Sequence, residues 1–105
     1  MKERVLRIVT SGSSASDGEL VARIADGDLG ALGMLYDRYA AMLLGFARKH
    51  SPAEDAEDDV QIAFLRAVDA ARRFDCERSA KPWLFGIAVQ VLRERRRALR
   101  RLSLA

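Results

Sequence analysis

The chain has 105 residues, the size of one compact domain, and it is too short for two domains of typical size. Half of its residues are hydrophobic, a composition that excludes a disordered tail. A single cysteine excludes an internal disulfide framework, and one cysteine with one histidine cannot form a usual four-ligand zinc site. No apolar run approaches the ~20 residues of a membrane helix. We therefore expect a cytoplasmic protein with no membrane insertion, metal or cofactor.

The formal net charge of +3 conceals two oppositely charged segments. Residues 54–59 contain five acidic side chains, whereas six arginines and one glutamate lie between Arg93 and Leu102. Two surfaces of opposite charge on one small domain predict two partners of different chemistry.

The hydrophobic pattern beyond a Ser/Gly-rich stretch at residues 10–16 is helical, with no alternating strand pattern. We expect a flexible N-terminal arm over residues 1–16 and an all-α domain over residues 17–102. The fold class is then a compact bundle of about four helices. The expected helices span residues 17–25, 29–49, 52–73 and 80–101.

The first two expected helices have clear end signals. Ser16 or Asp17 can cap the first helix, Gly27 ends it, and Asp28 can cap the second. Apolar side chains at three- and four-residue spacing predict one buried stripe on the second helix. This stripe consists of Leu32, Leu35, Tyr36, Tyr39, Leu43 and Phe46.

The third expected helix starts with the strongest local signal in the sequence. Residues 51–54 (SPAE) match a capping box, with Ser51 as cap and Pro52 at the first helical position. The core face of the helix is predicted to consist of Ala56, Val60, Ala63, Phe64, Ala67 and Ala71. On the opposite side lie Asp58, Gln61, Ile62 and Leu65. This mixture of apolar and polar groups is typical of a protein-docking face, although a surface helix with two incidental apolar residues is the alternative.

The last expected helix carries a line of Trp83, Gly86, Gln90, Arg93 and Arg97 along one side. Aromatic rings, amides and guanidinium groups are the types that contact bases and phosphates in nucleic-acid complexes. Four further cations surround the preceding loop, namely Arg72, Arg73, Arg78 and Lys81. The alternative is that Trp83 belongs to the core and the arginines are solvated helix-end charges. No Ser/His/Asp set, Cys/His pair or Gly-rich phosphate loop is present, so we do not expect an enzyme.

Taken in order, these segments resemble region 2 of the sigma-70 family of bacterial transcription initiation factors, in particular the extracytoplasmic-function (ECF) sigma factors. The resemblance covers about residues 17–101. It rests on the segments ELVAR (19–23), GD (27–28), LYDRY (35–39), DAEDDVQIAFLRA (55–67), RFD (73–75) and WLFGIA (83–88), followed by the Arg-rich run.

The resemblance implies roles for both surfaces. It implies that the third helix docks on the β′ clamp helices of core RNA polymerase, through Asp55, Asp58, Gln61, Ile62 and Leu65. It implies that the loop and last helix recognise and melt the promoter −10 element by capturing a flipped base. The implied DNA contacts are Arg72, Arg73, Arg78, Lys81, Trp83, Gln90, Arg93 and Arg97. An anti-sigma factor is a further implied partner.

Several positions depart from the pattern that the resemblance implies. Ile62 stands where the family usually has Glu, and residues 79–82 lack the aromatic residue that is common before the Trp. Gln90 replaces the usual Asn, and the helix-turn-helix of region 4, which reads the −35 element, is absent from this chain. A helical interaction module that docks without opening promoters, or a basic bundle that binds nucleic acid without specificity, therefore stays open as an alternative.

Overall fold

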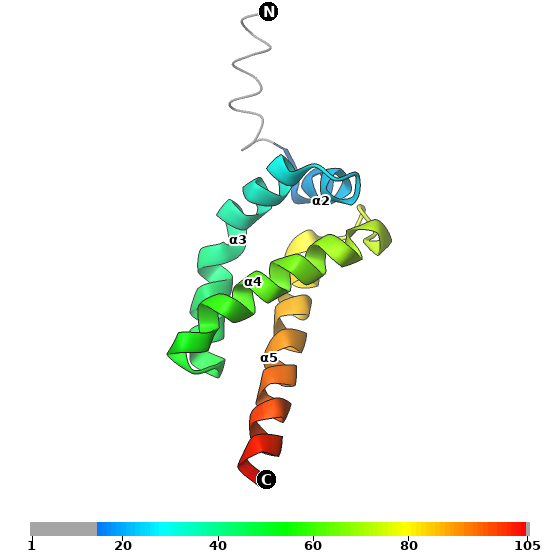
Figure 1. The fold of residues 1–105 in the computed structure, drawn as a ribbon. Helices are drawn as coiled ribbons and strands as arrows, with labels where there is room; N and C mark the ends of the chain where they lie inside the picture. Colours follow the sequence, from blue (N-terminus) through cyan, green and yellow to red (C-terminus); the bar gives the residue numbers. More distant parts are fainter. Residues whose placement is uncertain (1–14, 105) are drawn as a thin grey trace, which may run out of the picture.

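The computed structural model of the protein describes residues 15–104. The expected flexible arm lies outside the described residues except for its last two, Ala15 and Ser16. Within the described range the chain forms four α-helices and one 3-10 turn, without strands. In chain order these are α2 (Asp17–Ala25), α3 (Leu29–His50), α4 (Ala53–Ala70), η1 (Ala71–Arg73) and α5 (Ala80–Leu104) (Figure 1). The predicted all-α bundle of about four helices is confirmed.

The ends of α2 and the start of α3 follow their local signals. The Ser16 hydroxyl accepts a hydrogen bond from the Glu19 amide at 3.1 Å, and the Asp28 carboxylate accepts one from the Ala31 amide at 3.2 Å. Gly27 adopts a φ of +90°, a conformation that costs glycine little and other residues more. Short polar side chains and one glycine therefore fix the turn between the two helices, as predicted.

The start of α4 differs from the prediction, and the expected capping box is wrong. Pro52, not Ser51, occupies the N-cap position, and no side chain caps the helix. The Ser51 hydroxyl instead donates a hydrogen bond to the carboxylate of Asp59 at 2.8 Å. Because Asp59 is buried, its carboxylate needs a partner more than the exposed start of the helix does.

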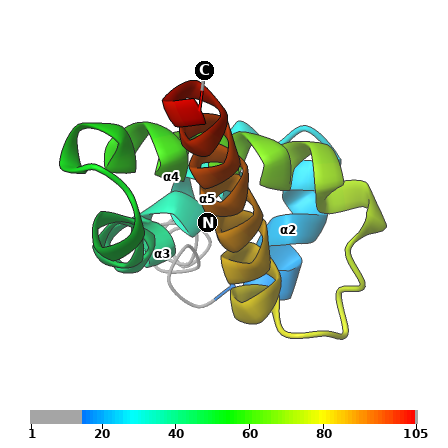
Figure 2. The same ribbon diagram turned by 90° about the horizontal axis from the view of Figure 1, so that it is seen from below.

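The helix α4 lies at the centre of the bundle and packs against both α3 and α5. Figure 2 shows α5 crossing α4, with α2 and α3 to either side, and in Figure 1 the end of α5 projects beyond the other helices. All six predicted core residues of the third helix are buried. The helix ends earlier than expected, because residues 71–73 tighten into η1. No helix among residues 15–104 combines the length and the apolarity needed to cross a membrane.

In the predicted stripe on α3, Leu35 and Leu43 are buried, and Leu32, Tyr39 and Phe46 are partly buried against the core. Tyr36 is 41% exposed, with its ring centroid 4.9 Å from that of Phe64. Tyr39 packs against the core and donates its phenolic hydrogen to Asp17. Burial and this hydrogen bond raise the pKa of Tyr39 to about 12. Arg38 pairs with the same carboxylate at 2.8 Å, so Asp17 ties the start of α2 to α3.

Candidate functional site

The exposed side of α4 forms one wall of an apolar groove shared with α3. Gln61 and Leu65 are exposed, and Leu65 exposes 64% of its surface. The groove has a volume of about 560 Å³ and is lined by Leu29, Leu32, Gly33, Tyr36, Asp37, Gln61, Phe64 and Leu65. We call these eight residues, together with Asp58, the docking face. An exposed apolar patch bordered by polar groups is typical of a protein-binding surface.

Sequence reasoning missed the part of the docking face that lies on α3. Leu29 is 76% exposed, and Tyr36 faces the groove although its spacing placed it in the buried stripe. The sequence signal for this part was an apolar residue, Leu29, directly after the helix cap Asp28 and outside the predicted buried stripe. Ile62, by contrast, is only partly exposed and packs against the core, so it does not line the groove.

The acidic cluster of α4 is held by an arginine of α5. The Arg95 guanidinium lies 2.6 Å from Asp59, 3.4 Å from Asp58 and 3.7 Å from Asp55. Asp59 is 2% exposed, and its carboxylate raises the pKa of Arg95 above the ordinary value. The Ser51 hydroxyl donates a further hydrogen bond to the Asp59 carboxylate. Two of the predicted polymerase contacts, Asp55 and Asp58, are thus already paired within the domain.

A second contact between α4 and α5 lies further along the two helices. Arg66 donates two hydrogen bonds to Glu94, at 2.6 and 2.9 Å, in the fork geometry that favours arginine. These bonds hold the pKa of Glu94 below its ordinary value, helped by Gln90 and Arg97 nearby. Both contacts fix the position of α5 on α4, and neither was predicted.

The loop between η1 and α5 borders an open cavity at the start of α5. This loop cavity has a volume of about 810 Å³ and is lined by Arg73, Phe74, Asp75, Arg78, Ser79, Pro82 and Trp83. Trp83 is half-buried, with its ring centroid 4.6 Å from that of Phe74. Phe74, at the start of the loop, thus supplies an aromatic partner for Trp83, although residues 79–82 contain no aromatic residue. Aromatic rings beside guanidinium groups can stack and hold an unpaired base.

The shape of the loop depends on a turn and on one glycine. The Asp75 side chain accepts a hydrogen bond from the Glu77 amide at 3.0 Å, and its carbonyl accepts one from the Arg78 amide at 2.9 Å. A Cβ atom on Gly18 would lie 2.9 Å from the carbonyl oxygen of Cys76. Real Cβ atoms do not approach so closely, so only glycine lets the loop pack on the start of α2.

The predicted DNA contacts do not form one cluster. Arg73, Arg78 and Trp83 line the loop cavity, whereas Lys81 is exposed outside it. The remaining helix positions, Gln90, Arg93 and Arg97, are exposed further along α5. We call the residues of the loop cavity, together with these three positions, the α5 face.

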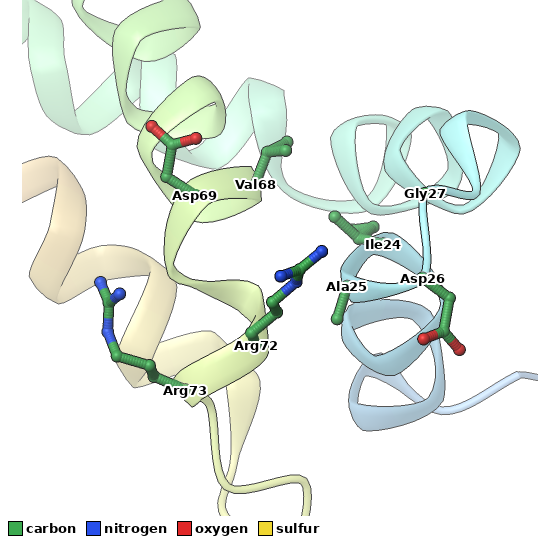
Figure 3. Close-up of a pocket in the computed structure, with 8 residues that line it drawn as sticks. All are labelled: Ile24, Ala25, Asp26, Gly27, Val68, Asp69, Arg72 and Arg73. Carbon is green, nitrogen blue, oxygen red and sulfur yellow. The ribbon is translucent and has the colours of Figure 1, made fainter.

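Arg72 lies apart from the α5 face, in a third cavity. This α2–η1 cavity has a volume of about 1060 Å³ and is lined by Ile24, Ala25, Asp26, Gly27, Val68, Asp69, Arg72 and Arg73. Figure 3 shows Arg72 extending from η1 toward α2, while Arg73 points away from it. Across the described range, no group of three or more His, Cys, Asp and Glu side chains is placed to hold a metal.

The comparisons with known proteins agree on one family. The sigma-70 region 2 model matches residues 35–102. RNA polymerase sigma factor NccH of Alcaligenes xylosoxydans xylosoxydans is 38% identical over 77% of this chain and 44% of its own length. The ECF RNA polymerase sigma-E factor of Escherichia coli K12 is 34% identical over 70% of this chain and 39% of its own length. The chain thus spans less than half the length of these relatives.

A solved structure has the same fold. It is the NMR structure of an engineered region 2 of sigmaE in complex with GTAAAA, with a TM-score of 0.78 and 33% identity. The alignment covers 84% of this chain and 93% of that one. The chain belongs to the sigma-70 region 2 family, as its resemblance to ECF sigma factors predicted.

Proposed function

We propose that this domain is the part of a transcription initiation factor that binds core RNA polymerase and the promoter −10 element. The loop cavity carries the DNA half of the proposal, because it places Trp83, Phe74 and two arginines around a space that fits an unpaired base. Support comes from the related sigmaE region 2, whose structure is a complex with GTAAAA. The domain then acts by binding and not by catalysis, in the cytoplasm with the polymerase.

Opening a duplex without a motor requires that the open form be bound more tightly than the paired form. A base held in the loop cavity would offset an unpairing cost of a few kcal/mol. The arginines of the α5 face would hold the phosphates on either side of that base. Arg93 forms no ion pair among the described residues, so its guanidinium is available to a phosphate.

The DNA half is tested with a fluorescent single-stranded GTAAAA oligonucleotide and its scrambled counterpart. We expect GTAAAA to bind at least several-fold more tightly than the scrambled strand, and Trp83→Ala to weaken it by about tenfold. Phe85→Ala is the matched control, because Phe85 is an aromatic residue of the same helix that contacts Phe46 and not the loop cavity. Equal affinity for the two strands would support a basic bundle without sequence preference.

The polymerase half is carried by the docking face. Among the described residues its apolar groove and Asp37 have no ion pair, whereas Asp58 is paired with Arg95. Leu65 and Gln61 are the exposed side chains of α4 in the groove, so they are the proposed anchors. In a pull-down with isolated β′ clamp helices, we expect Leu65→Ser to weaken binding about tenfold or more. Leu102→Ser, at a residue 73% exposed on α5, is the matched control. Equal binding of both variants would contradict the assignment of the docking face.

One observation favours the alternative of a module that docks without opening DNA. Ile62 packs against the core and offers no polar group where the family usually has Glu. An anti-sigma factor would then compete for the same groove. Binding to clamp helices or an anti-sigma factor, without measurable binding of GTAAAA, would select this alternative.

A further inference from the structure

The α2–η1 cavity lies next to the loop cavity, and Arg73 lines both. We propose that it is a second base-binding subsite, which receives a nucleotide of the same single strand beyond those held at the loop cavity. This proposal rests on the DNA half of the proposed function. The cavity, at about 1060 Å³, is larger than the loop cavity and is open to solvent.

The walls of the cavity suit the flat face of a base. Ile24 is buried, and Ala25 and Val68 are half-buried, which gives the cavity an apolar floor. In Figure 3, Arg72 extends across this floor toward α2. Guanidinium planes and apolar side chains both stack on bases, so a base can lie between Arg72 and the floor.

The Arg72 guanidinium is available for such a contact. Within the described range its side chain forms no ion pair or hydrogen bond, although Asp26 and Asp69 line the same cavity. Figure 3 places Asp69 on the far side of Arg72 from Ala25, and Asp26 at the outer edge of α2. An arginine that its two acidic neighbours leave unpaired retains its full capacity for a ligand.

The two carboxylates also determine which part of a nucleotide enters. Their negative charge disfavours a phosphate but not a neutral base, so the phosphates would remain with Arg73, between the two cavities, and with Arg78 at the loop cavity. Stacking on Arg72 and the apolar floor is stronger for the larger ring system of a purine than for thymine. The subsite is therefore expected to favour adenine over thymine.

The test compares GTAAAA with strands lengthened at the 5′ or the 3′ end by a short run of adenines or of thymines. We expect one adenine-lengthened strand to bind about tenfold more tightly than GTAAAA. The thymine-lengthened strand adds the same phosphates, and we expect it to recover only a small part of this gain.

Two variants locate the gain in the cavity. Ala25→Leu fills the floor and is expected to abolish the gain while GTAAAA itself binds as before. Ala53→Leu, at an exposed residue that starts α4, is the matched control and keeps the gain. Arg72→Ala is expected to lower the affinity for the lengthened strand about tenfold.

Two results would overturn the subsite without touching the proposed function. One is equal binding of GTAAAA and both adenine-lengthened strands, and the other is a gain that Ala25→Leu leaves intact. Failure of GTAAAA itself to bind would overturn the DNA half of the proposed function and the subsite with it.

Discussion

The docking face and the α5 face carry opposite charges, and part of each is paired within the domain: Asp58 of the docking face lies 3.4 Å from Arg95, and Arg78 of the α5 face lies 3.9 Å from Asp75. Arg95 pairs with three carboxylates at the start of α4, so the apolar groove with Asp37 at its edge is the part of the docking face left without an ion pair among the described residues. Arg73 and Arg93, on the other surface, have no ion pair in the part of the chain that the structure describes. The comparison teaches that the net charge of a segment does not reveal which of its charges a partner can still use.

The largest expected effect comes from substituting Arg95, which pairs with the acidic cluster of α4. Arg95→Met leaves the carboxylate of Asp59 buried without its cation, which should lower the free energy of unfolding by about 3–5 kcal/mol. Arg95→Lys keeps the positive charge but lacks the forked guanidinium, and we expect a smaller loss in the free energy of unfolding. Urea unfolding monitored by circular dichroism measures both.

Arg96→Met is the control for this prediction, because Arg96 is the exposed neighbour of Arg95 on the same helix. Surface substitutions of this kind usually change stability by less than about 0.5 kcal/mol. If Arg95→Met and Arg96→Met unfold at the same urea concentration, the acidic cluster does not depend on Arg95.

A second substitution acts on the α5 face alone. Gly18→Ala forces the added Cβ against the carbonyl oxygen of Cys76, so the loop must move or the domain loses about 1–3 kcal/mol. We expect weaker binding of GTAAAA together with a lower urea midpoint, and no change in binding of clamp helices per folded molecule.

Gly45→Ala is the matched control, since nothing lies within 4 Å of its added Cβ in the middle of α3. It should stabilise the domain by about 0.5–1 kcal/mol through the helix preference of alanine. If Gly18→Ala lowers the free energy of unfolding and Gly45→Ala raises it, glycine is required specifically at the contact between Gly18 and the loop. A stabilising Gly18→Ala would disprove that contact.

Salt sharpens the comparison without any substitution. Each phosphate held by the α5 face should lower the logarithm of the affinity for GTAAAA by roughly 0.7 per unit of log salt concentration. Binding of clamp helices should depend less on salt, because the groove of the docking face is mostly apolar and Asp37 is its one charged residue. Titrations of both ligands over the same salt range measure the two slopes. A steeper slope for the clamp helices would contradict the internal pairing of the acidic cluster.

The smallest expected effect concerns the pair of Arg66 and Glu94. Because this pair holds the pKa of Glu94 below its unfolded value of roughly 4.3, its contribution to stability is complete above that pH. The contribution is lost as the pH falls through the lower pKa of the folded state. It is small, because both side chains are about 40% exposed to solvent.

The variant Glu94→Gln isolates this contribution. Its deficit in urea midpoint against the unaltered protein should be present at neutral pH and vanish in acid. Asp69→Asn serves as control, since Asp69 is exposed and forms no ion pair among the described residues. A deficit that stays constant with pH would show that Glu94 acts through packing and not through its charge.

The sequence by itself determined what depends on neighbouring residues. The caps at Ser16 and Asp28, the turn at Gly27 and the core face of α4 all follow from spacing within a few positions. The order of the motifs was also sufficient to identify the family. These features were predictable because helix periodicity and capping are local interactions.

Only the tertiary structure decided the contacts between distant parts of the chain. Ser51 matched a local capping pattern, but its hydroxyl donates instead to Asp59, a buried carboxylate that also accepts a hydrogen bond from Arg95 of α5. Phe74 contacts Trp83 across the loop. Arg72 extends toward α2 while Arg73 points away from it, although the two are adjacent in sequence. The physical reason is that a buried charged or aromatic side chain needs a partner, and the fold supplies one from a distant part of the chain. The spacing of residues in the sequence does not reveal which distant residues the fold brings into contact.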